Sequence, residues 1–130
     1  MGEVFEKMCR YHVLEKGING DYGNFITKVG NWWGNEILVD ESENRRVNPT
    51  DIDIVGLSVL DKTMVIGECK FKNEKTGKSA FDALFKRGKL IEGKYKIVRY
   101  IIYSLNGYTD WYEDLHDLQL ELNTIDDLYQ

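Results

Sequence analysis

The feature that most constrains this chain is a nearly continuous apolar run at residues 96–105, which reads Lys-Ile-Val-Arg-Tyr-Ile-Ile-Tyr-Ser-Leu. A strand with one face in water alternates apolar and polar residues, whereas this run places apolar side chains on both sides. Such a strand has to lie in a sheet that is covered on both faces. The run therefore predicts a layered α/β fold with helices on either side of a central sheet.

The rest of the chain supplies helical and strand patterns in an order that fits this fold. The expected elements are a helix at 2–15 ended by Gly17, short strands at 25–29 and 36–39 around a corner at 31–34, a polar loop at 41–50, strands at 52–60 and 64–71 joined by a tight turn at 61–62, a helix at 79–92 capped by Ser79, the strand at 96–105, a short helix at 109–116, a strand at 118–122 and a last helical turn at 125–129. The 130 residues, 42% of them hydrophobic, match the size and composition of one domain. We therefore expect a single α/β domain over 1–130, with a central mixed β-sheet flanked by α-helices.

Composition excludes two other classes of protein. The sequence has no apolar run near the roughly 20 residues that a membrane-spanning helix needs. The acidic start Met1–Glu6 lacks the order of charge and hydrophobicity found in a signal peptide. Cys9 and Cys69 lie in apolar segments and form no spacing motif, which favours buried free thiols in a reduced, cytoplasmic protein.

Charge is distributed unevenly along the chain, whose net charge is -5. Residues 70–99 carry ten Lys or Arg against three acids, a balance of +7, whereas 100–130 carry seven acids and no Lys or Arg. The basic block could mark a face that binds a polyanion. Alternatively, a basic helix and an acidic C-terminal segment offset each other on one surface, and the net acidity favours this second interpretation.

Two neighbouring strand patterns bring carboxylates to one region. In Asp51-Ile52-Asp53-Ile54-Val55, strict alternation puts the two acids on one face and the two isoleucines on the other. In Ile66-Gly67-Glu68-Cys69-Lys70, Glu68 and Lys70 share a face. If the two strands pair as a hairpin, Asp53 and Glu68 lie side by side with Lys70 close to them.

Two carboxylates at such short range repel each other unless a cation lies between them. Mg²⁺ is suited to the site because it prefers oxygen ligands and is typically held by one or two carboxylates plus phosphate. The ammonium of Lys70 could then orient a water molecule or offset negative charge on a phosphoryl oxygen. The alternative is that Asp53, Glu68 and Lys70 form an internal salt-bridge network with no metal, and spacing alone does not decide between the two.

The same residues carry a family resemblance. Asp53 followed by Glu68-Cys69-Lys70 resembles the signature of the PD-(D/E)xK nuclease superfamily. The proline of that signature is not adjacent to the aspartate here, because Pro49 lies four residues before Asp53. A narrower likeness covers residues 2–122 and rests on Gly30-Asn31-Trp32-Trp33-Gly34, Asp51-Ile52-Asp53-Ile54-Val55, Gly67-Glu68-Cys69-Lys70 and Ser104-Leu105-Asn106-Gly107-Tyr108-Thr109. These segments resemble the uncharacterised nuclease-like domain at the C-terminus of prokaryotic AAA-type (DEXX-box) ATPases. The chain departs from that pattern at Pro49-Thr50-Asp51, where the subfamily commonly has Arg-Glu before Ile-Asp.

The resemblance implies a restriction-endonuclease-like core. It also implies that Asp53 and Glu68 bind Mg²⁺ or Mn²⁺ together with the backbone carbonyl of Cys69. Lys70 would be the catalytic lysine, and Glu6 in the first helix would be an auxiliary ligand or a water-positioning group.

In such nucleases the second helix often turns a polar residue toward the site, and Lys86 is the nearest candidate. The resemblance further implies an upstream ATPase domain, and a start at Gly2 inside the first helix would fit a domain excised from a longer protein. The expected function is that of a metal-dependent DNA phosphodiesterase, with DNA and the ATPase domain as partners. The alternative is a non-catalytic interaction or regulatory module of the ATPase, favoured by the net acidity and the aromatic-rich stretch at 95–112, with oligomerisation as one possible role.

Overall fold

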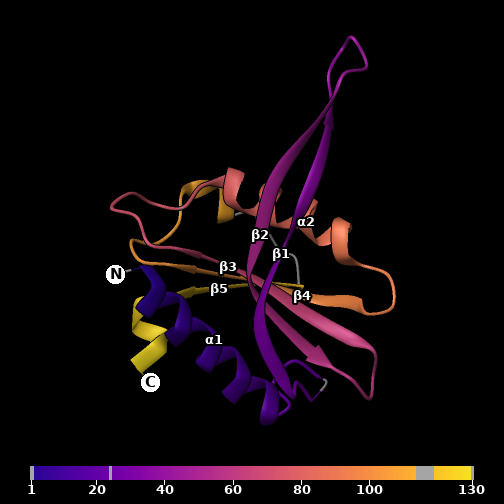
Figure 1. Cartoon of the computed structure of the whole chain (residues 1–130). Coiled ribbons are helices and arrows are strands. Elements are labelled where there is room, and N and C mark those ends of the chain that lie inside the picture. Colours follow the sequence, from indigo (N-terminus) through magenta and orange to yellow (C-terminus); the bar gives the residue numbers. More distant parts are fainter. Residues whose placement is uncertain (1, 24, 114–118, 130) are drawn as a thin grey trace.

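The computed structural model describes residues 2–23, 25–113 and 119–129. Its elements are α1 (Gly2–Ile18), β1 (Lys28–Val39), β2 (Arg45–Ser58), β3 (Thr63–Lys70), α2 (Lys78–Ile91), β4 (Lys96–Ser104), the 3₁₀ helix η1 (Asp110–Tyr112), β5 (Leu120–Thr124) and the 3₁₀ helix η2 (Ile125–Tyr129). The strands form one sheet in the order β1-β2-β3-β4-β5 (Figure 1). The first three are antiparallel neighbours, whereas β4 runs parallel to both β3 and β5. The predicted fold class, a restriction-endonuclease-like α/β core with a mixed sheet flanked by helices, is confirmed.

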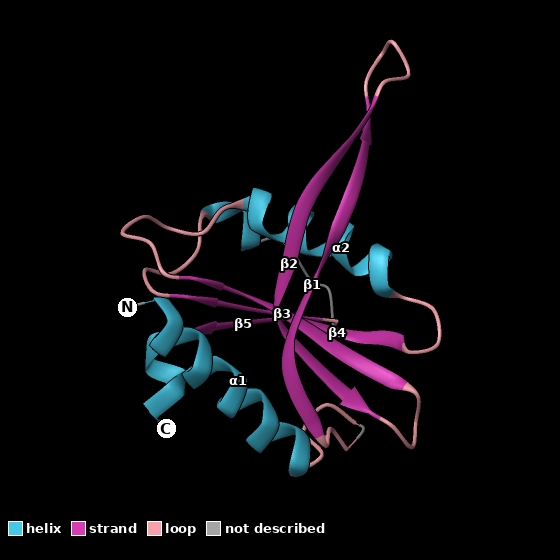
Figure 2. Ribbon diagram, viewed as in Figure 1, coloured by secondary structure: helices cyan, strands magenta, loops and turns pink. Residues whose placement is uncertain are grey.

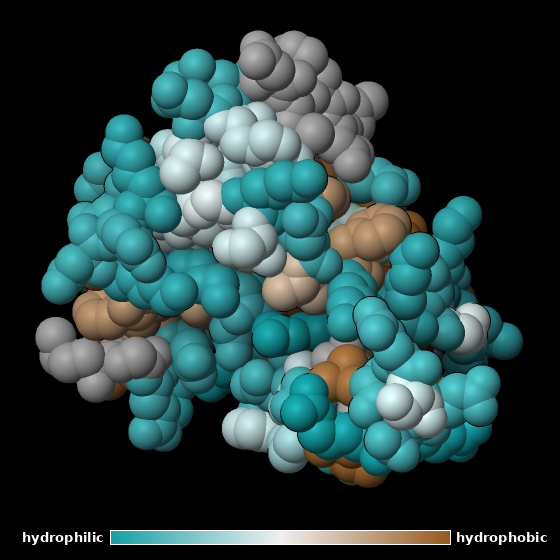
Figure 3. Space-filling model, turned by 90° about the horizontal axis from the view of Figure 1, so that it is seen from above, coloured by the Kyte–Doolittle hydropathy of each residue, from teal (hydrophilic) through white to brown (hydrophobic). Residues whose placement is uncertain are grey.

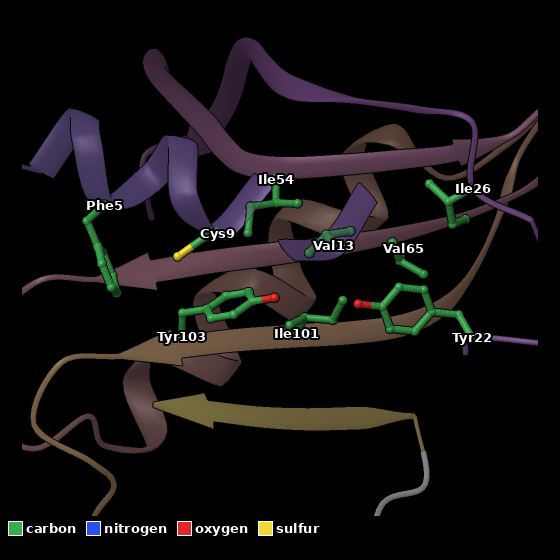
Figure 4. Packing of buried hydrophobic residues seen from close by; sticks show 9 residues of the cluster. All are labelled: Phe5, Cys9, Val13, Tyr22, Ile26, Ile54, Val65, Ile101 and Tyr103. Atoms are coloured by element: carbon green, nitrogen blue, oxygen red, sulfur yellow. The ribbon is translucent and has the colours of Figure 1, made fainter. Parts of the chain in front are cut away.

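Helix α1 covers one face of the sheet (Figure 2). Its residues Phe5, Cys9 and Val13 recur at i and i+4, so they form one stripe along the helix. Figure 4 shows this stripe lying over Ile101 and Tyr103 of β4. Burial of this apolar surface is the main term that holds α1 on the sheet.

Helix α2 covers the opposite face. Its fully buried Leu84 packs with Ile66 of β3 and with Ile97 and Ile102 of β4. The two cores together bury β4 from both sides, as the apolar run at 96–105 predicts. No helix in the described part of the chain is long and apolar enough to cross a membrane.

Strands β1 and β2 are longer than predicted. The expected corner at 31–34 is absent, because β1 runs through it without a break, and the expected polar loop at 41–50 belongs to β2 from Arg45 onward. Pairs such as Ile37↔Val47 and Glu36↔Asn48 hold the two strands together as a ribbon. Pairing between mostly exposed residues defines these strands, and the polar residues 41–50 give no sign of it in the sequence.

Strand β2 contains one irregularity that moves its side chains. The pairs Gly30↔Val55 and Trp32↔Ile52 are two residues apart on β1 but three apart on β2, so β2 carries one extra residue. As a result Ile54 enters the core under α1, whereas Ile52 enters the core under α2. The prediction that the two isoleucines share a face was therefore wrong.

Several predicted boundaries also change. Helix α1 continues past Gly17 to Ile18, and α2 begins at Lys78 with Gly77 rather than Ser79 as its N-cap. The predicted helix at 109–116 is the short 3₁₀ helix η1, and residues 114–118 lie outside the described part. The strand predicted at 118–122 is β5 at Leu120–Thr124, and the last helical turn at 125–129 is confirmed as η2.

Candidate functional site

Asp53 lies at the point where β2 and β3 separate. The last pair of the ladder between these strands is Ile54↔Gly67, so Asp53, the residue next to Ile54, lies just outside the ladder. Beyond it the backbone N–H of Cys69 donates a hydrogen bond to Oδ2 of Asp53 at 3.0 Å. The carboxylate thus replaces a strand carbonyl as acceptor, which holds an otherwise costly buried charge in place. Arg10 of α1 donates to the backbone oxygen of Asp53 at 3.1 Å and fixes the same point from the helix side.

Glu68 lies beside Asp53 and is almost fully buried, with 6% of its surface exposed. Its Oε1 is 3.3 Å from Nζ of Lys70, and its Oε2 is 3.3 Å from a guanidinium nitrogen of Arg87. Burial, followed by the negative charge of Asp53, raises the pKa of Glu68 to about 7, although both cations act against the shift. The negative charge on this side chain is therefore only partly compensated by its protein neighbours.

Glu6 approaches the site from α1. Its carboxylate is 3.9 Å from Arg10 and remains partly exposed. Burial raises its pKa first, and the negative charge of Asp53 raises it further. Asp53 thus lies within electrostatic range of Glu6 on the helix side and of Glu68 on the neighbouring strand.

The structure brings Asp53, Glu68 and Lys70 together, and Glu6 reaches this group only through its electrostatic interaction with Asp53. They come from three elements, with Glu6 on α1, Asp53 on β2, and Glu68 and Lys70 on β3. Cys69, whose carbonyl is the expected third metal ligand, lies between Glu68 and Lys70. Its N–H donates the hydrogen bond to the carboxylate of Asp53.

Arg87 and Arg10 are the two functional candidates that sequence reasoning missed. Lys86 was the expected polar residue on the second helix, but the guanidinium of Arg87 makes the contact with Glu68. Arg87 is three residues after the buried Leu84 and one before the buried Gly88, so helical spacing alone would have placed it near the sheet.

The chemistry of the donor set allows two states of the site. In the first, no metal is bound, Glu6 pairs with Arg10, and Glu68 pairs with Lys70 and Arg87 as an internal network. In the second, a divalent cation would be held by the carboxylate oxygens of Asp53 and Glu68 in place of the cations at Glu68. Within residues 2–23, 25–113 and 119–129, no group of three His, Cys, Asp or Glu side chains could hold a metal ion. A metal here would depend on two carboxylates and a backbone carbonyl.

A basic hollow of about 480 Å³ opens beside this acidic pair. Lys70 lines it together with Lys72, Glu74 and Lys75, and residues at the start of α2 line it as well. The positive end of a helix dipole and several ammonium groups both favour an anion. The positive block seen in the sequence is thus concentrated, in part, next to the candidate site.

Comparison with known proteins gives one relationship. No curated protein and no solved structure matches the chain. The family DUF234, described as archaeal and bacterial proteins of unknown function, matches residues 1–80. This stretch holds α1, strands β1 to β3 and the four predicted site residues. Because the match covers more than half of the 130 residues, the chain belongs to the DUF234 family.

Proposed function

We propose that this protein is a metal-dependent phosphodiesterase that acts on DNA. The observation that carries the proposal is the buried pair Asp53 and Glu68 at the separation of β2 and β3, with Glu68 at a pKa of about 7. A buried acid with a strongly raised pKa next to a second acid is a frequent mark of a functional site.

The residual repulsion between the two acids supports a divalent cation at this place. Lys70 and Arg87 together do not bring the pKa of Glu68 back to the ordinary value of 4.5. Mg²⁺ or Mn²⁺ held by Asp53, Glu68 and the carbonyl of Cys69 would stabilise both charged carboxylates. When bound, such an ion would act as a Lewis acid toward a phosphoryl oxygen.

The protein's own groups would then divide the remaining work. Released from Glu68, the ammonium of Lys70 is free to orient a water molecule or to offset charge on the phosphoryl oxygens. Glu6, partly exposed and with a raised pKa, is suited to accept a proton from that water or to complete the ligand set. Arg87 is placed to neutralise Glu68 before substrate arrives.

The basic hollow supports a phosphodiester as substrate. Lys72 and Lys75 lie there beyond Lys70, so a strand of DNA could place one phosphate at the acidic pair and a neighbouring one at the lysines. The local charge outweighs the net acidity of the chain because screening limits distant charges to a range of about 8 Å at physiological salt.

A second function is favoured by a different observation. Glu68 already has a cation at each of its oxygens, so the site is also complete as a structural network. In that case the domain would be a non-catalytic interaction or regulatory module of an AAA-type ATPase. The two functions share the fold and differ in whether a metal displaces the cations.

Cleavage of supercoiled and linear DNA, in Mg²⁺, in Mn²⁺ and in EDTA, tests the proposal. We expect metal-dependent cutting that falls about a hundredfold or more in Asp53→Asn and in Lys70→Ala. Asp126→Asn and Lys94→Ala repeat the same changes at exposed positions and should cut like the wild type. Equal cutting by all five proteins would reject the assigned site. Complete inactivity, combined with binding to the ATPase portion of a longer parent protein, would favour the second function.

A further inference from the structure

The distal half of the β1–β2 ribbon stands away from the body of the protein. Figure 1 shows it extending past α2 to a loop at the top of the view. In this part β1 and β2 pair with each other. A two-stranded ribbon is at best marginally stable in water unless one of its faces is covered. The ribbon is nevertheless paired continuously from Trp32↔Ile52 to Val39↔Arg45.

One face of this ribbon carries an apolar stripe. Alternation puts Trp33, Ile37 and Val39 of β1 on the same side, with the polar Asn35 between the first two, and the pairing places Val47 opposite Ile37 and Pro49 opposite Asn35. The exposed fractions are 72% for Trp33, 61% for Ile37, 59% for Val39 and 62% for Val47. Figure 3 looks down on the end from which the ribbon projects and shows hydrophobic residues exposed among hydrophilic ones. A row of exposed apolar side chains of this kind marks an interaction surface, even with one asparagine in it.

The charges around the stripe select the kind of partner. The loop at the end of the ribbon carries Asp40, Glu41 and Glu43, and Arg45 and Arg46 follow at the start of β2, so this end has no excess of positive charge to attract a polyanion such as DNA or an anionic membrane. Any partner must therefore match an apolar stripe with a near-neutral, slightly acidic surround.

The stripe is complementary to itself. It has a positive end, Arg45, which pairs with Val39, and a negative end, Asp51, which pairs with Trp33. If two ribbons lie face to face and antiparallel, the positive end of each meets the negative end of the other while the apolar residues meet in the middle. A two-fold axis requires this type of self-complementarity.

We propose that the stripe is a homodimer interface in which two copies of this chain pack their ribbons face to face, with Arg45 of one copy against Asp51 of the other. A buried tryptophan contributes about 150 Å² or more, and the stripe runs for about 20 Å along the ribbon. It therefore supplies the apolar centre of an interface whose usual size is about 800 Å² per copy. This proposal is independent of any activity at Asp53 and Glu68.

Sedimentation velocity of the whole chain over a range of micromolar concentrations is the first test. We expect a species of twice the 15.2 kDa of one chain, with association about tenfold weaker or more in Ile37→Asp. Arg45→Glu should weaken the dimer similarly, whereas Arg46→Glu makes the same charge change on the opposite face of the ribbon and should not. Far-ultraviolet circular dichroism checks that each variant is folded, which is expected because the changed side chains are exposed.

A mixing experiment separates a two-fold dimer from other contacts. Arg45→Glu alone and Asp51→Arg alone each set like charges against each other in the dimer, so each should associate about tenfold or more weakly than the wild type. Mixed together, the two variants restore opposite charges at both ends and should form a heterodimer. A wild-type chain that stays monomeric at high micromolar concentration, or a mixture that stays monomeric, overturns the proposal. A dimer that Ile37→Asp leaves intact overturns it as well, because the copies would then meet at another surface.

Discussion

Removing the negative charge of Glu68 should make the metal-free protein more stable at alkaline pH. Burial and the charge of Asp53 raise the pKa of Glu68 from 4.5 to about 7. Between these two values the folded state keeps a proton on Glu68 that the unfolded chain has already lost, so stability falls as the pH rises through this window. At about 1.4 kcal/mol for each pKa unit, the loss by pH 7 and above is about 3 kcal/mol.

Glu68→Gln mimics the protonated side chain and removes this dependence. In EDTA, wild type and variant should have similar stability near pH 5, and the variant should be more stable by up to about 3 kcal/mol near pH 8.5. The difference between the two proteins is the quantity to follow, because other groups titrate in both. His12 acts in the opposite direction, since burial lowers its pKa and stability falls when the pH drops below its ordinary value of 6.5.

Urea denaturation at a series of pH values measures this difference. Glu41→Gln, the same change at an exposed residue of the ribbon loop, is the matched control and should track the wild type at every pH. A wild-type-minus-Glu68→Gln difference that is constant from about pH 5 to about pH 8.5 would refute the reasoning, because Glu68 would then titrate alike in the folded and unfolded chain.

Two further predictions concern the two cores. Gly67→Ala should lower the free energy of unfolding by about 1–3 kcal/mol, because a Cβ there would lie 2.9 Å from the backbone oxygen of Ile101, which cannot move aside. Gly88→Ala meets only the ends of isoleucine side chains at 2.9 Å and gains helix propensity, so it should cost less; urea denaturation that ranks the two variants in the reverse order contradicts this account. The prediction of two buried thiols holds for Cys9, which is fully buried, but Cys69 is only partly buried, although its hydrogen bond with Cys9 and burial raise the pKa of its thiol. A thiol reagent should therefore modify Cys9 only as fast as the protein unfolds. Rapid modification of Cys9 in the folded protein would show that the face under α1 is open.

The layered fold could be predicted from the sequence because apolar burial leaves a pattern. Strand β4 is apolar on both sides, and α1 carries its buried residues at helical spacing, so both cores were visible in advance. The full length of the β1–β2 ribbon could not be predicted. Residues of β2 such as Asn48 and Pro49 are polar or strand-breaking, and this part of β2 is a strand because its backbone pairs with β1. The extra residue in β2 was hidden as well, since an irregularity depends on the partner strand and not on local composition.

The candidate site was predicted in part. Alternation placed Glu68 and Lys70 on one face correctly, as their ion pair shows. The irregularity in β2 changes how Asp53 reaches the site, and its carboxylate accepts from the N–H of Cys69 instead of only facing Glu68. The role of Arg87 could not be assigned from sequence alone, because it depends on how α2 lies over β3.

Whether a divalent ion binds at Asp53 and Glu68 is the central question, and calorimetric titration of the whole chain with Mn²⁺ answers it most directly. We expect one ion per chain at neutral pH, binding that weakens as the pH falls through about 7 because Glu68 takes up a proton, and loss of binding in Asp53→Asn but not in Asp126→Asn. Absence of Mn²⁺ binding in the wild type at alkaline pH, or unchanged binding in Asp53→Asn, would contradict the account and leave the acids and their cations as a structural network.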